Sequence, residues 1–506
     1  MFLTVSRARH IKCDETRPYC QRCLQKGMVC GGYLAVDANQ QAATAVIASP
    51  ITAYAIPFRI PGSQQDRRLL HYFCVQGAGD LSGHLSPDFW TRLVLQHSHD
   101  HISVRQAVVA LSCAHQGYIT SADSDGSVPA DAILYYSKAM RSLRKHMSAD
   151  IDNKREVSPM IPLICCILFF CFENTQGNTE AALRHLNSGI AILSREKGRE
   201  PLGPKSRDDE HLDVVEHMLA RLDLQASMFD DGRLPLMKHG AAIGSEASAW
   251  NTFKSIDDAQ AGLTKLQSWE LQFLISNERL KFRPENNLPD EVKLEKQAIE
   301  GAWAEWLEKL DRFAHYQSTP HGEHGGDHAN SNSPETSDVE EDSPAQTPEP
   351  AQDPAITILR IHYQIFRLLS SATLPYDPSV FAASPESPHY RAMNELLGLI
   401  ESTPQVREGS SRSLGAETGI IPPLFLIIMK CTDPAIFKRA FHLLLTISGR
   451  REGMFDSRVL VKIAMRFASQ HQTQDEAVAL EWQAGDALHK SVNGLDGFAK
   501  NLGIAP

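Results

Sequence analysis

Long apolar runs are missing from this chain of 506 residues. The most apolar stretch is Met160–Phe172, "MIPLICCILFFCF", and its 13 residues are too few to cross a bilayer, which takes about 20. We therefore expect this stretch to form a buried helix and the protein to have no membrane partner. A secretory signal is missing as well, because the basic residues follow the opening "MFLTV" instead of preceding it. These absences predict a soluble, intracellular protein.

Signatures of catalysis are also missing. The sequence contains no Gly-rich phosphate loop, no nucleophile elbow and no HExxH motif. We therefore predict that the protein is not an enzyme. The histidines of "HSHDH", which are His97, His99 and His101, alternate along a helix end. This spacing predicts that they do not converge on a metal ion.

Cysteine is scarce outside the first 30 residues, which argues against a disulfide scaffold. Four of the ten cysteines crowd into the N-terminus at Cys13, Cys20, Cys23 and Cys30, and the last three form a Cys-x2-Cys-x6-Cys unit. Thiolates at this spacing are ligands for zinc, so the N-terminus is a candidate metal site. The other six lie mostly in apolar stretches, where we expect buried thiols: Cys74, Cys113, Cys165, Cys166, Cys171 and Cys431.

Negative charge dominates the chain but not its N-terminus. The net charge is −11, which argues against nucleic-acid binding over the whole surface. Residues 1–33, however, contain six basic and two acidic residues, a balance of +4, so the remainder carries −15. A basic head on an acidic body predicts a polyanion-binding module attached to a second domain.

The stretch "SRARHIKCDETRPYCQRCLQKGMVC", Ser6–Cys30, resembles the fungal binuclear zinc cluster, in which six cysteines in two Cys-x2-Cys-x6-Cys units hold two zinc ions. The resemblance rests on the four cysteines, on the basic run before Cys13, on the acidic pair after it and on Pro18 in the loop. It implies zinc as the cofactor, with the four cysteines as its ligands. It also implies sequence-specific binding to double-stranded DNA, by a short helix that reads CGG-type triplets in the major groove.

The resemblance further implies roles for the basic residues of the head. Arg9 and His10 correspond to residues that contact base edges, although His10 stands where a lysine or arginine is more usual. Arg7, Lys12 and Arg17 correspond to candidates for phosphate contacts, which fix the register of a protein on DNA. These five residues are the expected DNA-binding set.

The start of the chain departs from the family pattern. Leu3 and Ser6 occupy the positions of the first two cysteines, and neither side chain is a good zinc ligand. Two explanations stay open. Either the coding start was placed wrongly and an upstream segment completes the cluster, or the head is truly truncated and binds DNA weakly or not at all. A single zinc on the four remaining cysteines would need a different backbone path.

Helical periodicity dominates the rest of the chain, and β-branched alternation is almost absent. In "EAALRHLNSGIAILSR" the residues Ala182, Leu186, Gly189, Ile190 and Leu193 fall on one side of a helix. The fold class that we predict is therefore all-α, with a small zinc-cluster head before a large helical domain.

Composition divides the chain into five segments. We predict a zinc-cluster head at 1–33, a linker at 34–64, and a helical regulatory domain in two parts, at 65–316 and 355–506. Between these parts, residues 317–354 contain nine acidic residues, no Lys or Arg, and very few apolar side chains. Because such a segment cannot bury enough surface to offset the entropy lost on ordering, we expect this acidic insert to be disordered.

The helical body resembles the fungal transcription factor regulatory domain that follows such zinc clusters, in stretches such as "LRHLNSGIAILSREKG". Together the two resemblances imply a nuclear DNA-binding regulator of genes transcribed by RNA polymerase II. The partners that they imply are DNA, the transcription machinery and a second copy of the chain. The alternative is an interaction protein that is defective in DNA binding and acts through the helical body alone.

Overall fold

The computed structural model describes the helical body of the chain, within residues 61–470. The described ranges are 61–85, 87–120, 129–152, 158–198, 207–229, 233–237, 252–318, 353–382, 385–407, 409 and 412–470. All of them belong to one compact unit, Ile56–Pro506. The expected zinc-cluster head, nearly all of the expected linker and residues 319–352 of the acidic insert lie outside the described residues.

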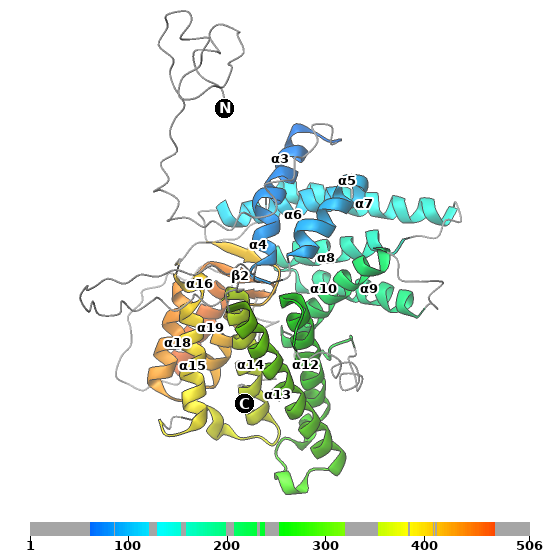
Figure 1. Cartoon of the computed structure of the whole chain (residues 1–506). Coiled ribbons are helices and arrows are strands. Elements are labelled where there is room, and N and C mark those ends of the chain that lie inside the picture. The colour runs from blue at the N-terminus through cyan, green and yellow to red at the C-terminus, as the bar shows by residue number, and fades with distance from the viewer. Residues whose placement is uncertain are drawn as a thin grey trace, which may run out of the picture. The chain divides into compact units, whose positions relative to one another are not determined.

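The described body is almost entirely helical, as the sequence predicts (Figure 1). Short π-helical turns (η3, Phe73–Gly77; η4, Phe89–Leu93) and 3-10 turns (η6, Glu278–Leu280; η7, Glu285–Asn287; η8, Pro378–Phe381) extend or join its α-helices. Among the described helices, none combines the length and the apolarity that a bilayer crossing requires. The α-helices are α3 (Gln64–Tyr72), α4 (Ala78–Ser82), α5 (Val94–Asp100), α6 (Ile102–Thr120), α7 (Ala130–Asp152), α8 (Met160–Thr175), α9 (Thr179–Lys197), α10 (Arg207–Phe229), α12 (Ile256–Ser276), α13 (Asp290–Ser318), α14 (Pro354–Thr373), α15 (Pro388–Ser402), α16 (Pro404–Arg407), α17 (Ile421–Lys430), α18 (Pro434–Thr446) and α19 (Ser457–Gln470).

Helix α8 lies at the centre of the first half of the body, where it packs against α6, α9 and α10. Every residue of α8 is buried, which confirms the buried helix predicted for Met160–Phe172. The predicted apolar side of α9 is also buried, from Ala182 to Leu193. At Gly189, α9 packs tightly against α8 and α10, since a Cβ there would stand 3.2 Å from Cys166 and from Leu219. A larger residue at this position would push the helices apart.

The six cysteines of the described body are all buried and free, as predicted. Burial raises the pKa of Cys74 to about 11 and the pKa of Cys166 to about 12. Because only the thiolate is a good metal ligand, these side chains act as small apolar residues of the core.

Helices α12, α13 and α14 lie side by side in the second half of the body (Figure 1). Two tryptophans of α13 hold them together. The indole N–H of Trp303 donates to Glu270 Oε2 of α12 at 2.8 Å, and that of Trp306 donates to the carbonyl oxygen of Ala259 at 3.0 Å. The Trp306 ring also stacks on Tyr363 of α14, with ring centroids 6.0 Å apart. These contacts position α12 and α14, which later form two walls of a cavity.

A small three-stranded sheet accompanies the helices, and the periodicity of the sequence does not predict it. Strand β1 (Ser413–Gly415) runs parallel to β2 (Arg450–Glu452), and β2 pairs antiparallel with β3 (Phe455–Asp456). Strands of two or three residues are too short to show alternation. The turn between β2 and β3 contains Gly453 with φ of 56°, a backbone conformation that favours glycine.

Candidate functional sites

The predicted zinc and DNA contacts belong to the N-terminal head, outside the described residues. They are Cys13, Cys20, Cys23 and Cys30 for zinc, and Arg7, Arg9, His10, Lys12 and Arg17 for DNA. Their mutual geometry therefore stays a prediction. The donor set can still be compared with the chemistry of zinc, which takes four ligands in tetrahedral geometry. Four thiols suit one zinc ion and fall two short of the six that hold two.

Two of the three histidines of "HSHDH" lie together, although the spacing predicts that the three do not converge on a metal ion. The rings of His97 and His101 stack with centroids 5.7 Å apart, because residues four apart share one face of a helical turn. His97 also meets His211 of α10 at 6.1 Å, and His101 meets His146 of α7 at 6.0 Å. Even so, within the described ranges no three His, Cys, Asp or Glu side chains are grouped so that they could hold a metal ion.

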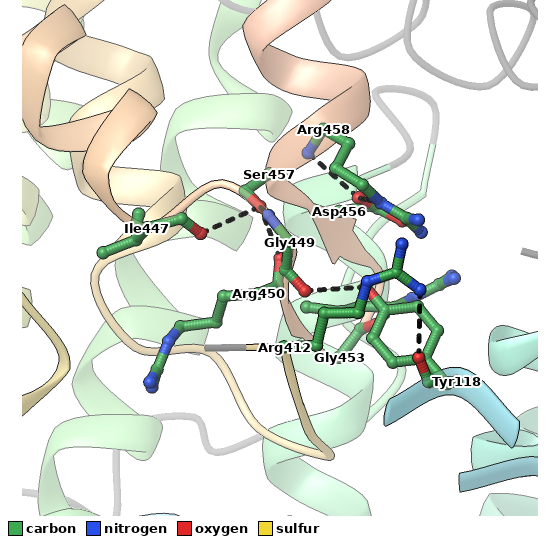
Figure 2. A network of polar contacts seen from close by, with 10 residues as sticks. Tyr118, Arg412, Ile447, Gly449, Arg450, Gly453, Asp456, Ser457 and Arg458 are labelled. Atoms are coloured by element: carbon green, nitrogen blue, oxygen red, sulfur yellow. Dashed lines mark hydrogen bonds and ion pairs between the residues drawn. The ribbon is translucent and has the colours of Figure 1, made fainter. Parts of the chain in front are cut away.

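Tyr118, near the end of α6, joins the first half of the body to the C-terminal segment (Figure 2). Its hydroxyl donates to the carbonyl oxygen of Gly449 at 3.2 Å, and its own carbonyl oxygen accepts from Arg412 Nη1 at 3.5 Å. The guanidinium of Arg458 stands 5.1 Å from the Tyr118 ring centroid and is held there by Asp456, Nη2 to Oδ2, at 2.8 Å. The polar network thus fixes α6 to the strands and to the start of α19.

His115, one turn earlier on α6, also connects this helix to distant parts of the chain. We call the contacts of Tyr118 and those of His115 the two joints. Only 1% of His115 is exposed. Its Nε2 lies 3.2 Å from the carbonyl oxygen of Leu414 in β1, and its Nδ1 lies 2.9 Å from the hydroxyl of Tyr72 in α3. A carbonyl oxygen only accepts, so Nε2 carries the proton and Nδ1 accepts from the tyrosine, which describes a neutral ring. Burial lowers the pKa of His115 to about 4.

A cavity of about 360 Å³ lies between α10, α12, α14 and α17, and we call it the apolar cavity. Its walls come mostly from side chains such as Leu271, Ile365, Phe366 and Leu426. His362 is one of the polar residues of the wall, and its Nε2 donates to the carbonyl oxygen of Gly419 at 2.7 Å. Small-molecule sites are likewise lined mostly by apolar side chains, with polar groups that orient the ligand.

Sequence reasoning missed both joints and the apolar cavity. For the joints one signal was available, a histidine and a tyrosine within the apolar stretch "VRQAVVALSCAHQGYI". Such residues, once buried in a helix, need hydrogen-bond partners from elsewhere in the chain. The cavity had no comparable signal, because its walls come from four helices that are far apart in the sequence.

Two family models match parts of the chain. Residues 7–36 match the fungal Zn(2)-Cys(6) binuclear cluster domain, and residues 68–258 match the fungal specific transcription factor domain. The first match contains all of the predicted zinc and DNA residues, while Leu3 and Ser6 precede it. The second match covers α6 with both joints and the part of the apolar cavity that α10 contributes.

Two curated relatives resemble the chain over its larger part. The aspercryptin biosynthesis cluster-specific transcription regulator atnN of Emericella nidulans is 26% identical over 344 residues, which is 61% of this chain and 53% of the relative. The transcription regulator lscL of Purpureocillium lilacinum is 25% identical over 303 residues, which is 53% of this chain and 70% of the relative. This chain therefore spans about half the length of the first. No solved structure matches it. Both families and both relatives are those of transcription regulators and not of enzymes, as the sequence predicts.

Proposed function

This chain carries the zinc-cluster and the regulatory domains of fungal transcription factors, and from that premise we propose that it regulates transcription by RNA polymerase II in the nucleus. One observation carries the proposal. The basic, cysteine-rich head matches the model of the zinc-cluster domain, and the helical body after it matches the model of the transcription factor domain. The names of both relatives, which are transcription regulators, support the same function.

DNA recognition, in this proposal, is confined to the head. Arg9 and His10 contact base edges of a CGG-type half-site, and Arg7, Lys12 and Arg17 contact phosphates. The head carries +4 and the rest of the chain −15, so the acidic body is repelled by DNA and leaves the contact to the head. Two copies of the chain bind two half-sites.

Zinc, when bound, fixes the backbone of such a small head, because so few residues cannot form a sufficient apolar core. We propose that Cys13, Cys20, Cys23 and Cys30 hold a single zinc ion. This ligand set uses every cysteine of the head and leaves the buried cysteines of the body out.

Fluorescence anisotropy with labelled duplexes tests the proposal. The full chain should bind a duplex with paired CGG triplets more tightly than a scrambled duplex. Replacement of a base-reading arginine, Arg9→Ala, should weaken binding to the CGG duplex about tenfold or more. The matched control is Arg184→Ala, since Arg184 is exposed on α9 and pairs with Glu180 at 2.6 Å. The proposal would be contradicted if the chain bound both duplexes with equal affinity and if Arg9→Ala did not change that affinity.

The second candidate is an interaction protein that uses only the helical body, and the observation that favours it is Leu3 and Ser6 in place of two cysteines. Such a protein does not bind the CGG duplex by itself. It instead lowers the DNA binding of a complete zinc-cluster regulator by forming mixed dimers with it. A competition assay with a complete zinc-cluster regulator that binds the same duplex distinguishes the two candidates.

A further inference from the structure

We propose that the apolar cavity binds the anion of a medium-chain carboxylic acid. The apolar tail lies among α10, α12, α14 and α17, and the carboxylate lies at Lys281 and Lys430. The cavity volume of about 360 Å³ falls within the range of small-molecule sites, roughly 300 to 1,000 Å³. The inference goes beyond the proposed function. It does not depend on DNA binding, because that function is assigned to the head, whereas every residue that lines the cavity belongs to the helical body.

The walls of the cavity fit an apolar tail. Leu224, Leu271, Phe366 and Leu426 come from four different helices and face one space. At the edge of the cavity the rings of Phe282 and Tyr376 meet edge to face, with centroids 5.6 Å apart. These two side chains are 75% and 44% exposed, which is unusual for large apolar residues unless they border a binding surface.

The charged groups of the cavity fit a carboxylate. Lys281, Lys430 and Glu278 all line it, and Glu278 approaches Lys281 at 3.6 Å from a largely exposed position. Lys430, the last residue of α17, has no carboxylate partner within the described part of the chain. Burial and the nearby charge of Lys281 lower the pKa of Lys430 to about 8. A half-buried ammonium without a carboxylate partner, beside a second ammonium, is costly, and an anion between them lowers this cost.

The remaining titratable groups of the cavity do not offset this positive charge. His362 donates its Nε2 proton to Gly419, and burial lowers its pKa, so its ring is neutral. Tyr376 is the other titratable side chain of the wall, and a phenol group adds no carboxylate to the cavity. The cavity therefore favours an anion over a neutral molecule of the same shape, and repels a cation.

Isothermal titration of the full chain with decanoate, below its micelle concentration, tests the proposal. We expect one saturable site, and an affinity for decanoate at least tenfold higher than for 1-decanol, which has the same chain without the charge. Lys430→Met should remove this preference, and Lys430→Arg should keep it. The matched control is Lys145→Met, because Lys145 is exposed on α7, which contributes nothing to the cavity. Ala372→Phe, which fills the cavity, should abolish binding of both molecules.

Absence of saturable decanoate binding would overturn the proposal, as would equal binding of decanoate and 1-decanol that Lys430→Met leaves unchanged. A second measurement guards against a folding defect. Because Lys430 is half-buried without a carboxylate partner, Lys430→Met should raise the melting temperature of the ligand-free chain while it weakens decanoate binding. A lysine whose ammonium simply reaches water would give no such gain in melting temperature.

Discussion

His115 shows how much a single buried residue can decide in this fold. It lies among apolar neighbours, yet its ring contacts α3 through Tyr72 and β1 through Leu414, two elements far apart in the sequence. Both hydrogen bonds fit a neutral ring. Protonation would add a proton on the side of Tyr72 and place a charge in a nearly dry site, with the Asp80 carboxylate 3.8 Å from Nε2 as the nearest compensation.

We predict that His115 makes the chain sensitive to acid. Its pKa is about 4 in the folded chain and about 6.5 in the unfolded chain, so the unfolded state binds the proton first. Stability is complete above pH 6.5 and falls as the pH drops towards 4, by about 3 kcal/mol in total from this residue. Urea unfolding at a series of pH values measures the loss.

The variant His115→Gln isolates this contribution from that of other buried histidines. Glutamine cannot be protonated, so the variant should be less stable than the wild type at pH 7 but should lose less stability on acidification. The control His71→Gln, at an exposed position on α3, should follow the wild type. The same acid dependence in wild type and His115→Gln would contradict the neutral-ring account.

At the scale of elements, the helices follow from the sequence far better than the strands do. The buried side of α9 is the one that its apolar spacing predicts, and Asn178 caps the helix, with its side chain accepting from the N–H of Ala181 at 3.4 Å. Helices repeat their signal over several turns, whereas β2 and β3 contain only three and two residues. The pairing of the strands depends on residues far away in the sequence, which no local pattern reveals. Strand β2, for example, pairs with β1.

Two glycines give a matched prediction at this scale. Gly453, in the turn between β2 and β3, has φ of 56°, and a Cβ there would overlap the buried amide of Gln225. Gly453→Ala should therefore lower the free energy of unfolding by at least about 2 kcal/mol, from backbone strain and overlap. Gly301 is exposed within α13 and a Cβ there meets nothing within 4 Å, so Gly301→Ala should raise it by about 1 kcal/mol.

Urea unfolding of both glycine variants against the wild type checks this prediction. The two changes add the same methyl group, so only the backbone conformation and the surroundings differ. Equal effects of the two substitutions would show that the β2–β3 turn does not have the conformation described.

At the scale of the whole molecule, the head and the body differ in what the sequence predicts. The sequence predicts the ligands of the head, whereas only the structure shows the cavity of the body. The cysteine spacing and the basic run Arg7–Lys12 predict the head without any coordinates, because the ligands of a metal site of this kind are close in the sequence. The apolar cavity could not be predicted, because Lys281 and Lys430 are 149 positions apart and only the packing of α12, α14 and α17 brings them together.

The zinc content of the purified full chain, measured by plasma mass spectrometry, tests the account of the head most directly. The account predicts one zinc per chain, held by Cys13, Cys20, Cys23 and Cys30. Cys20→Ala should lose this zinc, while Cys431→Ala, at a buried cysteine of the body, should keep it. A wild-type chain without zinc, or with two zinc ions, would contradict the proposed four-cysteine site.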